Sequence, residues 1–159
     1  MALPPELGAL VAELNREGLD YVVVGGVAVN LLGYVRATND LDVLVPATPA
    51  QGDRIRALLE RLGATRPDGS ELPSHLFDGE HHVRALTPSG LIDFIPEGES
   101  PLTYEAVRAA ARADELGGQP VLRVGLAHLT LLKRLADRPR DREDLAALEQ
   151  AYGPLPAPE

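Results

Sequence analysis

The segment from Tyr21 to Leu32 constrains the fold of this chain more than any other. It opens with a β-branched run, Tyr21–Val24, which predicts a short strand, and Gly25 and Gly26 follow this run at once. After the glycines, the apolar residues return at helical spacing from Val27 onward. A strand that turns into a helix over two glycines predicts a sheet with helices packed on it.

The rest of the chain alternates apolar runs with segments of helical period. Further helices are expected from about Leu7 to Gly18, at Thr48–Leu62, at about Thr103–Glu115, at Leu126–Ala136 and at Arg140–Tyr152. Further strands are expected at Leu41–Val45, at His81–Leu86 and Leu91–Ile95, which form a hairpin, and at Val121–Val124. The polar segment Thr65–Gly79 is expected to be a loop. We therefore predict one α/β (α+β) domain over residues 1–152, with a mixed β-sheet flanked by helices, C-terminal helices, and a loose proline-rich tail at 153–159.

Charge and composition limit the kind of protein. The 159 residues include 15 Lys and Arg against 24 Asp and Glu, a net charge of −9, which argues against a surface that clamps nucleic acid as a whole but allows a local basic patch. The chain has no cysteine, so disulfides and thiolate metal sites are excluded. Its N-terminus lacks the pattern of a signal peptide and no apolar run is long enough to span a membrane, so we expect a cytoplasmic protein.

The two glycines after the first predicted strand allow two interpretations. Gly25 and Gly26 let the backbone approach a ligand closely and aim free N–H groups at an anion. Their spacing fits neither a Walker loop nor a dinucleotide fingerprint. The same pair also fits a tight corner between strand and helix with no ligand.

Two aspartates lie on the next predicted strand. Residues two apart on a strand point to the same face, so the carboxylates of Asp40 and Asp42 project together. Two like charges raise one pKa unless a cation lies between them, and Mg²⁺ prefers such oxygen ligands together with substrate phosphates. The alternative is a strand whose end carries two solvated aspartates.

A third aspartate, Asp93, stands inside the apolar strand Leu91–Ile95. A buried carboxylate is costly unless it is paired or binds a metal ion. Asp93 is either a structural acid held by a backbone N–H or an arginine, or the third carboxylate of a two-metal site. The second interpretation requires its strand to lie beside that of Asp40 and Asp42.

Basic residues concentrate near the C-terminus. Lys133 falls at the end of one predicted helix and Arg140 at the start of the next, and Pro139 disfavours helix at Arg138, so this stretch predicts an elbow. Its cations could reach the oxygens of a triphosphate. The alternative is a solvated charged turn in which Lys133 pairs with Asp137.

Together these residues resemble the nucleotidyltransferase superfamily related to DNA polymerase β. The resemblance rests on Gly25-Gly26, on the segment Arg36-Ala37-Thr38-Asn39-Asp40-Leu41-Asp42-Val43, and on Asp93. The Arg-x-Thr-x-Asp-Leu-Asp segment and a closing group of charged residues are closer still to the AbiEii-like toxin branch. That closing group comprises Lys133, Arg138, Arg140, Asp141 and Asp144.

The resemblance implies a role for each of these residues. Asp40, Asp42 and Asp93 would bind Mg²⁺ or Mn²⁺, and Asp93 would also help to deprotonate the acceptor hydroxyl. Lys133 would complete the catalytic set by neutralising charge on the triphosphate. The nucleotide would be held by phosphate-cradling, supporting and pocket-shaping residues, namely Gly25, Gly26, Arg36, Thr38, Lys133, Arg138 and Asp141. Many members carry serine where this chain has Gly26, so part of the usual phosphate contact is missing.

The implied activity is transfer of a nucleoside monophosphate from an NTP such as ATP to an acceptor hydroxyl. The resemblance implies the toxin of a toxin–antitoxin pair, which would modify a tRNA end or a protein and would have a cognate antitoxin as partner. An antibiotic nucleotidyltransferase of the aminoglycoside type, with a small-molecule acceptor, and a non-catalytic relative that binds nucleotide or a partner are the alternatives. We expect His75, His81 and His82 to be solvated or structural.

Overall fold

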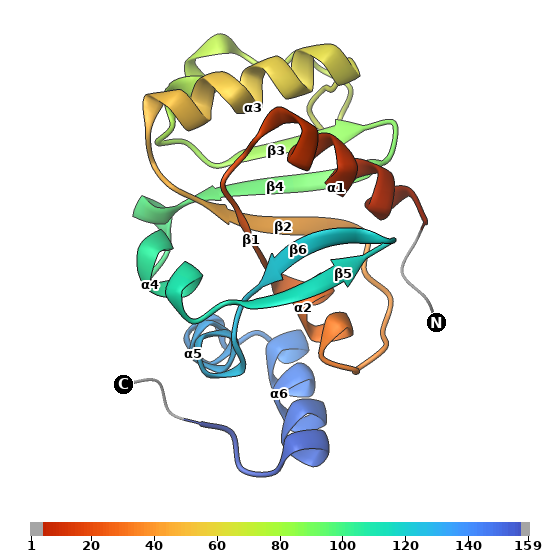
Figure 1. Cartoon of the computed structure of the whole chain (residues 1–159), viewed down its shortest axis with the longest axis vertical. Helices are drawn as coiled ribbons and strands as arrows, with labels where there is room; N and C mark the ends of the chain where they lie inside the picture. Colours follow the sequence, from red (N-terminus) through yellow and green to blue (C-terminus); the bar gives the residue numbers. More distant parts are fainter. Residues whose placement is uncertain (1–4, 157–159) are drawn as a thin grey trace.

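A single mixed sheet of six strands, in the order β3-β4-β2-β1-β6-β5, organises the computed structural model, which describes residues 5–156 (Figure 1). The strands are β1 (Val22–Val24), β2 (Asp40–Val45), β3 (Val83–Thr87), β4 (Gly90–Pro96), β5 (Arg112–Leu116) and β6 (Gln119–Arg123). The helices are α1 (Pro5–Glu17), α2 (Gly25–Leu31), α3 (Pro49–Leu62), α4 (Tyr104–Ala109), α5 (Leu126–Ala136) and α6 (Pro139–Tyr152). The predicted mixed sheet flanked by helices, with helices at the C-terminal end, is confirmed.

The pairing of β2 with its neighbours sets the positions of the acidic residues. β2 runs parallel to β4 and antiparallel to β1. In this register Asp42 lies opposite Asp93 on β4 and opposite Val24 on β1, the residue just before the two glycines. Backbone pairing therefore brings together three segments that are far apart in the sequence.

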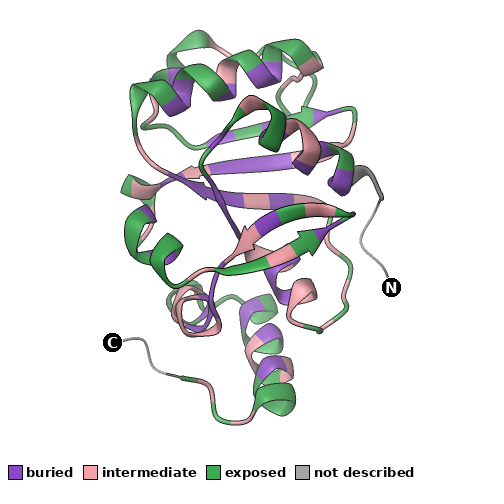
Figure 2. Cartoon of the chain, viewed as in Figure 1, coloured by how far each residue is buried: buried purple, intermediate pink, exposed green. Residues whose placement is uncertain are grey.

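The two faces of the central strands differ in polarity. Leu41 and Val43 on β2 and Ile92 and Phe94 on β4 alternate with the aspartates and are almost fully buried. Helix α1 crosses the sheet and contacts β4, β5 and β6, and it also contacts α3 (Figure 1). On this side of the sheet, burial decreases from the centre to the edge: β1 is buried along its length, whereas the edge strand β5 is mostly exposed (Figure 2). The apolar face thus anchors the strands that carry the acids on their other face.

The predicted helix Thr103–Glu115 is wrong in its second half. Helix α4 ends at Ala109, and Arg112–Leu116 is a strand paired antiparallel with β6. Gly117 and Gly118 both have positive φ, which suits a two-residue hairpin turn. Pairing with β6 therefore overrides the helical propensity of this alanine-rich stretch.

Two smaller differences concern a turn and a loop. The glycine pair is the first turn of α2 rather than a separate corner before it. The predicted loop Thr65–Gly79 contains a short 3₁₀ helix, Ser74–Asp78, and Thr65 bridges to Leu86. The predicted loose tail 153–159 falls partly outside the described residues.

In the part of the chain that the structure describes, no helix is both long and apolar enough to cross a membrane.

Candidate active site

Three carboxylates converge on one face of the sheet. Asp40 and Asp42 project from β2 and Asp93 from β4, and one oxygen of each lies within 4.8 Å of the others. Asp93 is only 4% exposed, whereas Asp40 and Asp42 are half-buried. Strand periodicity predicted that Asp40 and Asp42 share a face, and the parallel pairing of β2 with β4 meets the condition under which Asp93 joins them.

Gly25 closes one side of the carboxylate group. It has a φ of +67°, and a Cβ placed there would overlap Asp42 Oδ2 and lie 3.0 Å from its Cγ. The left-handed conformation and the close approach both require glycine. The first turn of α2 therefore lies directly against the Asp42 carboxylate.

Two basic side chains contact the third aspartate. Arg84 on β3 lies opposite Asp93 in the antiparallel register, and its Nη1 donates to Asp93 Oδ2 at 2.5 Å and to Asp40 Oδ2 at 3.0 Å. His82, just before β3, has its Nε2 2.8 Å from Asp93 Oδ1. His82 therefore contacts the carboxylate group and lines the cleft above it, and its expected solvated or structural role stays a prediction.

Sequence reasoning missed both basic residues, although a signal was present. The two-residue turn Pro88-Ser89 pairs Thr87 with Gly90 and so places Arg84 opposite Asp93. His82 precedes the strand, so strand periodicity does not place its side chain. Counting back from the hairpin turn would have found Arg84.

The site separates the pKa values of two carboxyl groups. Burial, followed by the negative charge of Asp93, raises the pKa of Asp42 to about 7. Burial also acts to raise the pKa of Asp93, but hydrogen bonds from His82 and Asp42 and the charge of Arg84 outweigh it and lower that pKa. The hydrogen bond to Asp93 in turn raises the pKa of His82. At neutral pH Asp93 is therefore ionised, and Asp42 is poised between its two forms.

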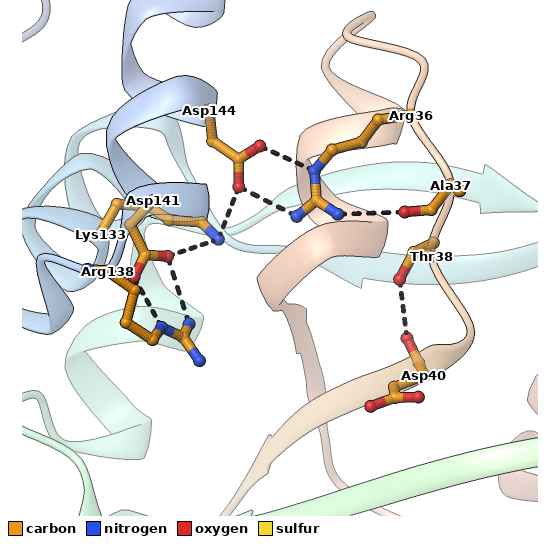
Figure 3. Close-up of polar contacts among 8 residues, drawn as sticks. All are labelled: Arg36, Ala37, Thr38, Asp40, Lys133, Arg138, Asp141 and Asp144. Atoms are coloured by element: carbon orange, nitrogen blue, oxygen red, sulfur yellow. Dashed lines mark hydrogen bonds and ion pairs between the residues drawn. The ribbon is translucent and has the colours of Figure 1, made fainter.

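A second charged cluster, which we call the buried ion network, lies beside the carboxylates and joins α5, α6 and the segment before β2 (Figure 3). Asp144 is fully buried and accepts from Arg36 at 2.7 and 2.9 Å and from Lys133 Nζ at 2.9 Å. Asp141, also fully buried, accepts from Lys133 Nζ at 3.0 Å and from Arg138 Nε at 2.7 Å. Burial alone would raise the pKa of Asp141, but its bonds from Arg138 and Lys133 lower it to about 2. The predicted elbow is thus held by buried ion pairs.

The network limits what two of the predicted residues can do. Lys133 Nζ is held by two carboxylates, and the residue is 4% exposed, so only its third hydrogen remains for a phosphate. Its predicted partner Asp137 pairs with Arg142 instead. Arg36 is bound in a fork to Asp144, and its position beside the glycines follows from that pair.

Polar groups of other residues lie beside Gly26, where many members of the resembled superfamily carry serine. A Cβ at Gly26 would lie 3.0 Å from both Arg36 Nη2 and Thr38 Oγ1. A guanidinium and a hydroxyl therefore border the second glycine, at the position that a serine side chain would approach. Thr38 Oγ1 also donates to the carbonyl of Asp40 at 3.4 Å, which supports the start of β2 (Figure 3).

A cleft of about 630 Å³ opens over the three carboxylates. Its lining includes the glycine pair and basic side chains from several elements, namely Arg36, His82, Arg84, Lys133, Arg138 and Arg140. A second cavity of about 380 Å³ adjoins it and shares Gly25, Asp42, Ile95, Lys133 and Arg138. That cavity is lined mainly by apolar side chains, including Leu44, Leu129, Leu132 and Leu135.

All ten predicted site residues are therefore placed around one cleft or directly behind it. Nine of them line the larger cleft, and the tenth, Asp141, lines the second cavity and accepts hydrogen bonds from Lys133 and Arg138. The carboxylate group fits a divalent ion, because it offers three hard oxygen donors in a site where burial, and then the negative charge of Asp93, raise the pKa of Asp42. Asp40, Asp42 and Asp93 are the residues that would hold it.

Comparison with known proteins identifies the fold. No protein-family model and no curated protein matches the sequence. The lincosamide antibiotic adenylyltransferase LnuA, with lincomycin bound, is similar at a TM-score of 0.68 and 14% identity, over 93% of this chain and 97% of that one. The antibiotic-resistance factor ANT(2'')-Ia is similar at a TM-score of 0.64 and 18% identity, over 93% of this chain and 83% of that one.

A third similar structure is a nucleotidyltransferase-like protein from Paracoccidioides brasiliensis, with a TM-score of 0.62 and 18% identity, over 93% of this chain and 76% of that one. These likenesses show that the chain has the nucleotidyltransferase fold, as its motifs predicted. The AbiEii-like branch stays a prediction.

Replacement of Gly25 by alanine should displace the Asp42 carboxylate. Gly63 offers a matched control, because its φ of +65° gives the same backbone strain while nothing lies within 4 Å of an added Cβ. We expect Gly25→Ala to abolish Mn²⁺ binding in calorimetry and Gly63→Ala to keep it, at a stability loss of about 1–2 kcal/mol. Equal metal affinity in the two variants would contradict the proposed contact.

The raised pKa of Asp42 predicts a pH-dependent stability. A folded-state pKa of about 7 against 3.8 in the unfolded chain means that folding binds a proton, so this contribution is lost as pH rises toward and through 7. Asp42→Asn lacks it. In EDTA, the stability of this variant relative to wild type should rise by about 1–3 kcal/mol between pH 5 and pH 8, as measured by urea unfolding. A difference that does not change with pH would contradict the prediction.

Loss of Asp144 should destabilise the whole fold. Asp144→Ala leaves Arg36 and Lys133 without their shared buried partner, and breaking such a pair costs about 3–5 kcal/mol. The control is Arg142→Ala, which breaks the exposed pair with Asp137 and should leave the free energy of unfolding nearly unchanged. Chemical denaturation of both variants tests this, and similar losses in the two would show that the network is not a structural anchor.

Proposed function

We propose that this protein is a divalent-metal-dependent nucleotidyltransferase that moves a nucleoside monophosphate from an NTP to an acceptor hydroxyl. The observation that carries the proposal is the convergence of Asp40, Asp42 and Asp93 at the floor of a cleft with basic walls. The similar fold of the antibiotic adenylyltransferases supports the same class of reaction.

In the reaction, the acceptor oxygen forms a bond to the α-phosphorus and the bond from that phosphorus to the bridging oxygen breaks, so pyrophosphate leaves. A bound Mg²⁺ or Mn²⁺ would supply charge neutralisation and a more acidic acceptor hydroxyl. Before a metal ion binds, His82 and Arg84 hold Asp93 ionised, and in the reaction this carboxylate accepts the proton that the hydroxyl loses.

The chain's own groups account for binding of the triphosphate. The backbone at Gly25 and Gly26 borders the cleft without side chains, so phosphate oxygens can approach it closely. Arg140 lies exposed on the rim, while Arg138 and Lys133 are oriented by Asp141. Oriented donors of this kind favour the charge that develops on the leaving pyrophosphate.

Two observations point to different acceptors. The exposed Arg138 and Arg140 form a basic rim that suits the phosphates of a tRNA end, and toxin activity would follow from transfer to such an end or to a protein hydroxyl. The apolar second cavity beside Asp42 suits a small acceptor instead, and the fold of LnuA, whose structure holds lincomycin, supports this alternative. A cognate antitoxin is a partner only in the first case.

Label transfer from radioactive nucleotides tests the function and the acceptor together. Each of the four NTPs, labelled at the α-phosphate, is incubated with Mg²⁺ and with total tRNA, cell extract, lincomycin or tobramycin. We expect label to move to one acceptor class with wild type and at least about a thousandfold more slowly with Asp42→Asn.

The control for this assay is Arg61→Gln, which removes the two ion pairs of Arg61 with Glu13 and Glu17, outside the cleft lining, and should keep full activity. Magnesium-dependent NTP binding by wild type without transfer to any acceptor would favour the non-catalytic alternative. Transfer that persists in Asp42→Asn would show that the carboxylate group is not the active site.

A further inference from the structure

Arg84 occupies a position that the proposed reaction does not explain. Its Nη1 lies between Asp40 Oδ2 at 3.0 Å and Asp93 Oδ2 at 2.5 Å, and so it bridges two of the three carboxylates. The side chain comes from β3, the edge strand beside β4, and is 42% exposed at the cleft. A guanidinium in this position offsets the repulsion between the two acids.

The same oxygens belong to the group that would hold a divalent ion. The carboxylates of Asp40 and Asp93 accept hydrogen bonds from Arg84. The same two carboxylates belong to the group of three that fits a divalent ion. Two cations that share these oxygens repel each other, so binding of one weakens binding of the other. The contact with Arg84 is therefore a competitor for the metal rather than a support for it.

Once displaced from the carboxylates, the guanidinium of Arg84 can turn into the cleft. Arg84 lines the same cleft as Lys133 and Arg140, and its backbone on β3 is fixed by strand pairing with β4. A long, half-exposed arginine side chain can turn from the carboxylates toward the cleft without a backbone change. A guanidinium freed at this wall would meet the oxygens of a polyphosphate.

We propose that Arg84 is an exchangeable cation of the site, which pairs with Asp40 and Asp93 until a divalent ion displaces it and then binds the triphosphate of the incoming nucleotide. This inference rests on the proposed function and deepens it, because it couples arrival of the metal to formation of a phosphate contact. It also gives the metal-binding carboxylates a built-in counter-charge.

The proposal predicts effects of opposite sign from one substitution. Arg84→Gln should bind Mn²⁺ about tenfold more tightly than wild type, because charge-assisted hydrogen bonds to the carboxylates no longer compete. At saturating Mn²⁺ the same variant should bind the non-reactive analogue α,β-methylene-ATP about tenfold more weakly. Calorimetry measures both affinities without turnover.

Arg140→Gln is the matched control. It removes the same charge from the same cleft, but within the described residues Arg140 makes no ion pair with a carboxylate. Its Mn²⁺ affinity should change much less than that of Arg84→Gln. Equal gains in the two variants would mean that only the overall charge matters, and would overturn the exchange.

Folding and function are separated by two further measurements. Thermal unfolding shows whether Arg84→Gln is folded. If it is not, Arg84→Lys, which keeps the charge on a shorter side chain without the guanidinium group, should show both effects at smaller size. Unchanged or weaker Mn²⁺ binding overturns the proposal, as does tighter metal binding with undiminished affinity for the analogue. A wild type that binds both ligands yet transfers no label overturns the proposed function instead, so the two failures are distinct.

Discussion

The mutual repulsion of three carboxylates is the constraint on which the rest of this structure depends. Asp40, Asp42 and Asp93 are held together by the β2–β4 ladder and by the buried apolar residues on the opposite face of the sheet. Because the backbone fixes their positions, the charge cannot relax by moving apart. It is offset instead by Arg84 and His82 and by partial protonation of Asp42, because burial and then the charge of Asp93 raise the pKa of Asp42 to about 7.

The buried ion network gives the site a second layer of rigid charge. Arg36 and Lys133 meet on Asp144, and Lys133 and Arg138 meet on Asp141, so segments before β2 and at both ends of the elbow are tied together. Fully buried acids with several charged partners hold only one arrangement well. The glycine pair, the acids and the basic rim therefore keep their relative positions through side-chain pairs as well as through the sheet.

The sequence could predict what depends on local periodicity and missed what depends on pairing between strands. Asp40 and Asp42 share a face because they are two apart on a strand, and that holds in any sheet. Arg84 enters the site only through the hairpin register, and β5 exists only because β6 pairs with it. Asp144 was part of the motif, but its bonds to Arg36 join residues 108 positions apart, which no local pattern specifies.

The polarity of one sheet face separates a region that suits a charged nucleotide from a region that suits a less polar acceptor substrate. Along β2 this face runs from Asp40 through Asp42 to Leu44, so it changes from acidic to apolar within a few residues. The basic side chains gather over the acidic end, whereas the leucines of α5 cover the apolar end. Desolvation makes the apolar end costly for a triphosphate, and the cations make the acidic end favourable for it. Asp42, which borders both cavities, stands where the two substrates of a transfer reaction would have to meet.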